Sequence, residues 1–160
     1  MLKKIISGGQ TGADRAALDV AIKHNIPLGG WIPRGRLAED NPLPDRYHFR
    51  EMPTSNYSAC TERNVIDSDG TLIVSHGKLA GGSDLTRKFA ILHGRSWLHI
   101  DLNLTDHTDA AVKIKEWLVQ EEIEVLKVAG PRASKDPIIY NKVVELLELV
   151  CAGVLNGNKA

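Results

Sequence analysis

The sequence is poor in cysteine, carries no excess of charge and contains no long apolar run. Cys60 and Cys151 lie far apart, and neither cysteines nor histidines show metal-ligand spacing, so we expect free thiols and no metal site. Twenty basic residues balance twenty acidic ones, which argues against a broad nucleic-acid-binding surface. No stretch resembles a signal peptide or a membrane span, so we expect a cytoplasmic protein without a membrane partner.

What the chain does contain is a glycine-rich turn near its start. An apolar run over residues 4–7 breaks into the sequence Gly8-Gly9-Gln10-Thr11-Gly12, and a helical pattern follows. Glycine permits positive φ and a close approach of backbone to ligand, and the amides that begin a helix favour an anion. Taken alone, this motif is equally compatible with an oxyanion site and with a plain turn between a strand and a helix.

Two further turns of this kind follow apolar runs. Residues 71–75 lead to His76 and to Gly81-Gly82-Ser83, and residues 125–129 lead to residues 130–135. In a parallel sheet the carboxyl ends of the three strands lie on one edge, where open α/β sheets bind ligands. We therefore favour a ligand site at this edge over packing alone.

The helix expected over residues 12–24 places Asp14 on its core-facing side. This carboxylate is interpreted either as a complement to the helix dipole or as a group that grips a hydroxyl or amine of the ligand. Arg15, Asp19 and Lys23 follow one another at intervals of four residues. That spacing predicts a solvated row of salt bridges.

A long irregular segment follows the second expected strand. Residues 37–55 show no periodicity and hold three prolines, and we expect them to form an ordered lid. Arg34 and Arg36 stand just before this segment, where we expect them to reach the ligand. The acidic pair Glu39-Asp40 is interpreted either as solvated or as a contact to a metal or a base edge.

The helices after the second and third turns have clear apolar spacing. In the last helix, Asp136 is the expected N-terminal cap, and Gly153 and Gly157 are the expected end. The expected apolar stripes are Leu85, Phe89 and Leu92 in the first of these helices and Ile139, Val143, Leu146, Leu147 and Val150 in the second.

A strand and a helix alternate about five times along the chain, without a repeat or a second domain. The 160 residues, of which 42% are hydrophobic, suffice for one domain with a substantial core. This order predicts one Rossmann-like α/β domain over residues 1–160. We expect a three-layer α/β/α sandwich with a doubly wound, mainly parallel sheet of about five strands.

These motifs together resemble the molybdenum carrier family, and the resemblance spans nearly the whole chain. The family is a circularly permuted branch of the Rossmann-like SLOG superfamily, related to YpsA and to lysine-decarboxylase-like nucleotide hydrolases. The matching segments are residues 7–19, residues 30–36 with Glu39-Asp40, residues 63–65 with 68–73, residues 81–83 with Thr86, and residues 129–134 with Pro137 and Tyr140.

The resemblance implies two different functions. Molybdenum cofactor carriers bind and protect a pterin that bears a phosphate and a molybdenum–oxo group, whereas the wider superfamily binds nucleotide-derived ligands and some members cleave nucleoside monophosphates. The phosphoribohydrolases carry a Pro-Gly-Gly-x-Gly-Thr motif followed by a glutamate. Here residues 80–86 lack the later glycine, and Arg87 and Lys88 stand where an acid is needed.

We therefore expect a binding protein for a small anionic, phosphate-bearing heterocycle, with molybdenum cofactor as the named candidate. The alternatives are a nucleotide sensor and a nucleotide hydrolase, for which Asp14 and Glu39 are the acid–base candidates. We also expect a homo-oligomer. The residues expected to bind the ligand are Gly8, Gly9, Gln10, Thr11, Gly12, Arg15, Arg34, Arg36, His76, Lys78, Gly81, Gly82, Ser83, Thr86, Gly130, Arg132 and Ser134.

Overall fold

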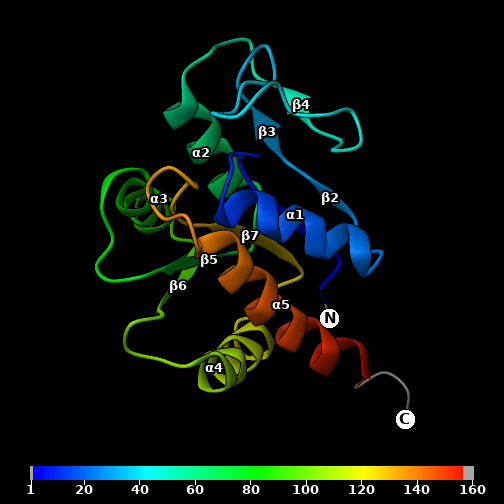
Figure 1. The fold of residues 1–160 in the computed structure, drawn as a ribbon, viewed down its shortest axis with the longest axis vertical. Coiled ribbons are helices and arrows are strands. Elements are labelled where there is room, and N and C mark those ends of the chain that lie inside the picture. Colours follow the sequence, from blue (N-terminus) through cyan, green and yellow to red (C-terminus); the bar gives the residue numbers. More distant parts are fainter. Residues whose placement is uncertain (1, 157–160) are drawn as a thin grey trace.

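A five-stranded parallel sheet runs through the centre of the computed structural model, which describes residues 2–156 (Figure 1). All neighbouring strands of this sheet are parallel. The strand order is β2 (Leu28–Gly29), β1 (Lys4–Ile6), β7 (Val125–Ala129), β5 (Gly70–Ser75) and β6 (Ser96–Asp101).

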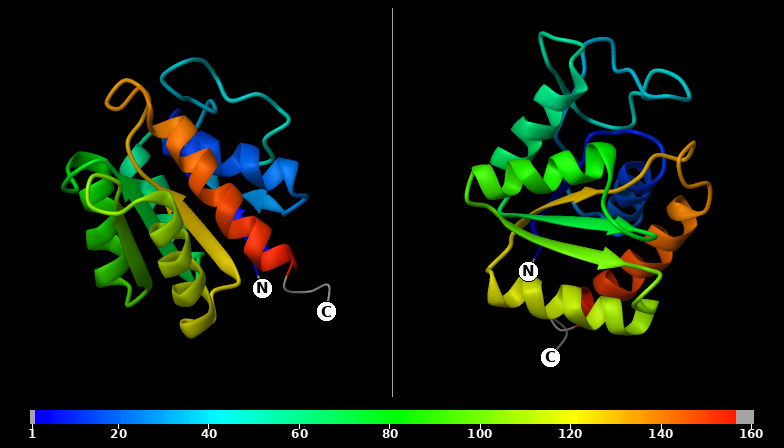
Figure 2. Two further views of the ribbon diagram at one scale, coloured as in Figure 1. Left: turned by 60° about the horizontal axis from the view of Figure 1, so that its bottom comes forward. Right: turned by 90° about the vertical axis from the view of Figure 1, so that its left-hand side faces the viewer.

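Helices cover both faces of the sheet. On one side lie α1 (Ala13–Lys23), α4 (His107–Gln120) and α5 (Ile139–Asn156) (Figure 2). On the other side lie α2 (Tyr57–Ile66) and α3 (Gly81–Leu92). The predicted three-layer α/β/α fold is therefore confirmed.

The main core lies between the sheet and the three-helix layer. Ile5, Leu72 and Val128 project into it from the central strands and are fully or almost fully buried. The apolar stripe expected on α5 is confirmed, because each of its five residues is at most 1% exposed. The expected end of this helix at Gly153 is wrong, since α5 continues to Asn156. Gly157 lies outside the described residues.

The predicted apolar face of α3 is rotated from the observed one. Thr86 and Ala90, which are four residues apart, are the fully covered residues of this helix, whereas Leu92 is 69% exposed. The face that includes Leu92 is therefore open to solvent, and α3 lies at the side of the molecule (Figure 2). Among residues 2–156, no helix combines the length and hydropathy needed to cross a membrane.

The segment between β2 and α2 forms a separate small lobe above the sheet (Figure 1). Its two short strands, β3 (Trp31–Ile32) and β4 (Arg50–Glu51), pair in parallel with each other. Leu43 and Tyr47 are buried in a second apolar cluster with Leu18 of α1. The segment expected to be an ordered lid is thus packed against the first helix.

Candidate functional site

The turns after β1 and β7 lie against each other at the carboxyl edge of the sheet. The amide of Ala13 donates to the carbonyl of Pro131 at 3.2 Å, and the amide of Ala133 donates to Thr11 Oγ1 at 3.1 Å. Gly12 makes this approach possible. Its φ is 78°, and a β-carbon there would lie 2.4 Å from the Pro131 carbonyl oxygen.

The turn after β5 reaches the same edge at a different place. His76 Nδ1 lies 2.6 Å from Asp136 Oδ2, which joins this turn to the segment before α5. Gly81 and Gly82 are the first two residues of α3 and do not precede the helix. A β-carbon on either glycine would meet no heavy atom within 4 Å, and Ala80, at the helix cap, offers no side-chain acceptor. The amides that begin α3 are therefore open to an anion.

Glu39 of the small lobe extends its carboxylate between the first and third turns. It accepts hydrogen bonds from the amide of Ser134 at 3.0 Å, from the hydroxyl of Ser134 at 2.6 Å and from the hydroxyl of Thr11. Arg132 Nε lies 3.6 Å away. The hydroxyl groups of Ser134 and Thr11 hold the pKa of Glu39 below its usual value. Four donors from two turns thus converge on one ionised carboxylate.

Asp40, which follows Glu39, also forms a salt bridge, and its partner is Arg15. The solvated row expected for Arg15, Asp19 and Lys23 is not formed. Arg15 donates to both carboxylate oxygens of Asp40, at 3.0 and 3.2 Å, and its side chain is only 14% exposed. Asp19 accepts hydrogen bonds from the hydroxyl groups of Tyr47 and Tyr140. Lys23 pairs with Glu148. The members of the predicted row therefore bind partners elsewhere, because the lobe and α5 cover this face of α1.

Asp14 lies beneath the β1–α1 turn and is 7% exposed, as expected from its place on the core-facing side. Its Oδ2 accepts from the hydroxyl of Tyr57 at 3.0 Å and from the amide of Gln10 at 3.3 Å. Burial raises the pKa of Asp14, while the positive charge of Lys127 acts in the opposite direction. Gly8 leaves room for this arrangement, since a β-carbon there would lie 2.6 Å from the Tyr57 hydroxyl.

Sequence reasoning missed Tyr57 and Lys127. Lys127 is 2% exposed in the middle of β7, and burial lowers its pKa. A lysine inside an otherwise apolar strand is itself a signal, because lysine is almost never fully buried without a functional or structural reason. Burial and the charge of Asp14 raise the pKa of Tyr57 well above its usual value. No sequence signal distinguishes Tyr57 from an ordinary first-turn residue of α2.

Other predicted ligand residues lie apart from the two joined turns. The guanidinium group of Arg36 donates to the carbonyls of Leu43, Pro44 and Tyr47 and thereby folds the lobe. Arg34 is exposed. The hydroxyl of Thr86 donates to the carbonyl of Gly82 within α3. Lys78 lines a cavity of about 530 Å³ with Asp84 and Trp97, beyond the end of β5 and along β6.

The described residues hold no group of three or more histidine, cysteine, aspartate or glutamate side chains arranged to bind a metal ion. Cys60 and Cys151 are buried free thiols, as expected. The carboxyl edge therefore presents hydrogen-bond donors and cations around the carboxylate of Glu39, with the buried carboxyl group of Asp14 below them.

Comparison with known proteins places these features in a family. Residues 5–151 match the model described as "Circularly permutated YpsA SLOG family". A crystal structure of a protein from Syntrophus aciditrophicus, named "Putative molybdenum carrier protein", is 60% identical in sequence. It superposes with a TM-score of 0.92, and the match covers 93% of this chain and 94% of that one. No curated protein matches the sequence.

Proposed function

The chain belongs to the circularly permutated YpsA SLOG family, and from that premise we propose that it binds a phosphate-bearing heterocycle at the carboxyl edge of its sheet. The named candidate is molybdenum cofactor, which the protein would carry or store. The name of the Syntrophus aciditrophicus relative supports this choice. We propose further that the protein works in the cytoplasm as a homo-oligomer.

The single observation that carries this proposal is the set of donors around Glu39. Carboxylate and phosphate groups are both oxyanions, and donors that suit one also suit the other. The hydroxyl of Thr11, the amide and hydroxyl of Ser134 and the guanidinium of Arg132 already converge on such a group. A phosphate would take the position of the Glu39 carboxylate after that side chain swings away.

The remainder of the ligand would extend along the edge of the sheet. The backbone of residues 8–12 and the turn at Gly130 would border it on one side. The open amides that begin α3, at Gly81, Gly82 and Ser83, would hold a second anionic group. A pterin phosphate with a metal–oxo group has two such anionic ends. The chain would hold the metal through the pterin, since the described residues offer no cluster of metal ligands.

Thermal unfolding against a ligand panel tests the proposal. The panel contains phosphate, molybdate, tungstate, pterin phosphates, AMP, GMP, ADP-ribose and NAD. A ligand at a hundred times its Kd adds about 2.7 kcal/mol of stability, which raises Tm by several degrees in a protein of this size. We expect pterin phosphates to raise Tm in the natural protein and to lose this effect in Ser134→Ala. If no ligand of the panel raised Tm, the result would contradict an anion site at this edge.

A second function, hydrolysis of a nucleotide, is favoured by one observation. Asp14 is a buried carboxyl group with a raised pKa directly beneath the glycine turn, which is the environment that tunes a carboxyl group for general acid–base work. Glu39 is less suited to donate a proton, because its pKa is lowered. A nucleotide sensor would use the same site without turnover.

Release of base or phosphate from AMP and GMP separates these functions. An enzyme that uses Asp14 would lose turnover in Asp14→Asn and still bind the nucleotide. Glu62→Gln is the matched control, because Glu62 pairs with His93 away from the turns. If neither the natural protein nor the control releases product, the carrier or sensor function stands and the hydrolase is excluded.

A further inference from the structure

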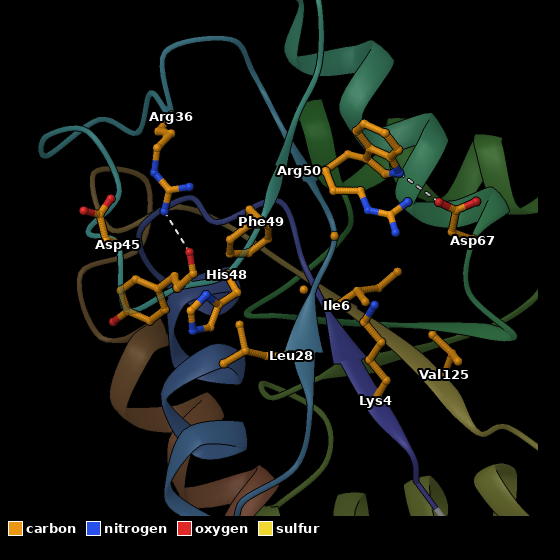
Figure 3. Close-up of a pocket in the computed structure, with 14 residues that line it drawn as sticks. Lys4, Ile6, Leu28, Arg36, Asp45, His48, Phe49, Arg50, Asp67 and Val125 are labelled. Carbon is orange, nitrogen blue, oxygen red and sulfur yellow. Dashed lines mark hydrogen bonds between the residues drawn. The ribbon is translucent and has the colours of Figure 1, made fainter.

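A second cavity lies where the small lobe faces β1 and β2. Its volume is about 460 Å³, within the range of about 300–1,000 Å³ that small-molecule sites occupy. Lys4, Ile6 and Val125 line it from the sheet, and Phe49 and Arg50 line it from the lobe (Figure 3). Arg36 is the only residue of the predicted ligand set that lines this cavity.

Two cations point into the same part of this cavity. Figure 3 shows the Lys4 side chain rising from β1 and the Arg50 side chain descending from β4 toward it. Within residues 2–156, neither of them forms an ion pair with a carboxylate. Like charges that face one space repel each other, and an anion placed between them removes the repulsion.

The two carboxylates that line the cavity do not supply that anion. Asp67 accepts hydrogen bonds from Trp31 Nε1 at 2.9 Å and from Arg63 Nε at 3.3 Å. Asp45 lies on the other side of the cavity from Lys4 and Arg50 (Figure 3). The cationic half of the cavity, beside Ile6, is therefore open to an external anion.

The remaining surface favours a flat ring. Gly29 and Gly30 form a floor without side chains, and Phe49, Leu28 and Ile6 supply apolar surface around it. The Trp31 ring is less available, because Arg50 and Arg63 each lie 5.6 Å from its centre. Tyr47 is almost fully buried, so Phe49 and His48 are the remaining lining rings against which a planar group would stack.

From this geometry we propose that the cavity is a second binding site, which takes a planar aromatic anion with its acidic group between Lys4 and Arg50. The site shares no donor with the Glu39 cradle, so the proposal does not rest on the function proposed above. A carboxylate, a sulfonate or a phosphate on the ring would satisfy the two cations.

Isothermal titration with 2-naphthoate, 2-naphthol and inorganic phosphate tests this site in the full-length protein at pH 7 and low salt. The acid tests ring and charge together, and the neutral naphthol tests the ring alone. Phosphate tests the charge alone, as the difference in binding between the natural protein and Lys4→Met, because phosphate that binds at the Glu39 cradle is common to both. We expect 2-naphthoate to bind at least about tenfold more tightly than 2-naphthol, the effect of one charge-assisted contact, and more tightly than phosphate does at this cavity. Equal binding of 2-naphthol, or no binding of 2-naphthoate at millimolar concentration, overturns the proposal.

Three substitutions locate the binding. Lys4→Met and Arg50→Met should each weaken 2-naphthoate binding by about tenfold. Gly29→Ala should also weaken it, because the new methyl group would lie 3.1–3.2 Å from the end of the flexible Lys4 side chain and displace it. Lys3→Met is the matched control, since Lys3 is 70% exposed and pairs with Glu124. Binding that survives both charge substitutions overturns the proposal.

Two outcomes keep this site separate from the phosphate cradle. Ser134→Ala should leave 2-naphthoate binding unchanged, whereas Lys4→Met should leave unchanged the part of any pterin phosphate Tm shift that Ser134→Ala removes. If Ser134→Ala abolishes 2-naphthoate binding in a folded protein, the ring anion binds at the carboxyl edge and the second site is wrong. Circular dichroism and Tm of each variant establish that the fold is intact.

Discussion

Glu39 and Ser134, 95 residues apart, are joined by two hydrogen bonds to a single side-chain carboxylate. The amide of Ser134 donates to Oε1 at 3.0 Å and its hydroxyl donates to Oε2 at 2.6 Å. The carboxylate is thereby held at the turn that precedes α5. This geometry makes Glu39 an internal competitor for any oxyanion that binds to the same donors.

Replacement of Glu39 by glutamine should therefore strengthen anion binding. Glutamine keeps the size of the side chain and removes its charge, so the donors at Thr11 and Ser134 become free for phosphate. We expect the affinity for inorganic phosphate or AMP, measured by isothermal titration, to rise about tenfold, the worth of one charged hydrogen bond. In the natural protein, Glu39 should keep its hydrogen bonds to Thr11 and Ser134 at neutral pH, because its pKa is lowered and the carboxylate protonates only in acid.

Glu62→Gln removes the same charge from α2 and controls for a general change in net charge. It should leave anion affinity unchanged. A loss of phosphate binding in a folded Glu39→Gln protein would mean that Glu39 contacts the ligand directly, and the competitor role would be wrong.

The sequence predicted the fold well because its patterns are local. The stripe from Ile139 to Val150 identifies the buried face of α5 from spacing alone, and the full burial of that face follows. A rule of parallel sheets places the three turns on one edge, and the contacts of Thr11 with Ala133 and of His76 with Asp136 agree with it. Spacing failed for Leu92, because a helix at the side of a sheet covers a narrower face.

The contacts within the candidate site could not be predicted from the sequence, because residues that meet from distant parts of the chain show no local pattern. Glu39 was recognised as an acid of interest, yet no pattern in residues 37–55 connects it to Ser134. The same holds for the bond between Tyr57 and Asp14, which joins α2 to α1. Two-residue strands such as β3 and β4 also cannot be predicted from local sequence, since each forms only by pairing with the other in the folded protein.

Gly12 and Gly82 should respond very differently to alanine. At Gly12 the φ is 78° and a β-carbon would lie 2.4 Å from a backbone oxygen, so Gly12→Ala should lose at least about 2 kcal/mol of unfolding free energy. At Gly82 no heavy atom lies within 4 Å and the residue is helical, so Gly82→Ala should be neutral or slightly stabilising. Urea unfolding monitored by circular dichroism measures both.

The same pair tests the open amides of α3. Gly82→Ala adds a methyl group at the start of that helix, so it should weaken pterin phosphate binding if a second anionic group sits there. Full binding by a stable Gly82→Ala protein would remove α3 from the ligand site. Equal stability of the Gly12 and Gly82 variants would contradict the close contact of the first and third turns.

Lys127→Met should raise the pKa of Asp14 further. The charge of Lys127 lowers the pKa of that buried carboxyl group, and methionine has a similar length without the charge. A carboxyl group whose pKa is raised by folding stabilises the protein below its unfolded pKa and loses that contribution as the pH rises through the folded value. The fall in stability with rising pH should therefore extend to higher pH in Lys127→Met.

Carboxyl carbon shifts of Asp14, followed by NMR from pH 3 upward, measure the titration directly. Lys113→Met on the exposed face of α4 is the control and should leave the Asp14 curve in place. An unchanged Asp14 titration in Lys127→Met would show that the charge of Lys127 does not act on Asp14.

Tyr140→Phe should reduce stability at neutral pH and reduce its dependence on alkaline pH. Tyr140 donates its hydroxyl to Asp19 Oδ2 at 2.5 Å, and burial together with this bond to Asp19 raises its pKa from 10.0 to about 12. Loss of a hydrogen bond to a carboxylate should cost about 1.5–3 kcal/mol. The natural protein keeps this contribution below the unfolded pKa and loses it between pH 10 and about 12, as only the unfolded state deprotonates.

Urea unfolding at pH 7, 10 and 12 measures both effects. The natural protein should lose more stability than Tyr140→Phe between pH 10 and 12, so the two values should converge at the alkaline end. Tyr47→Phe breaks the other hydrogen bond to Asp19, at 2.6 Å, and shows whether the two tyrosines act independently. If Tyr140→Phe and the natural protein lose stability in parallel over this interval, Tyr140 does not titrate with a raised pKa, and Asp19 does not hold its proton.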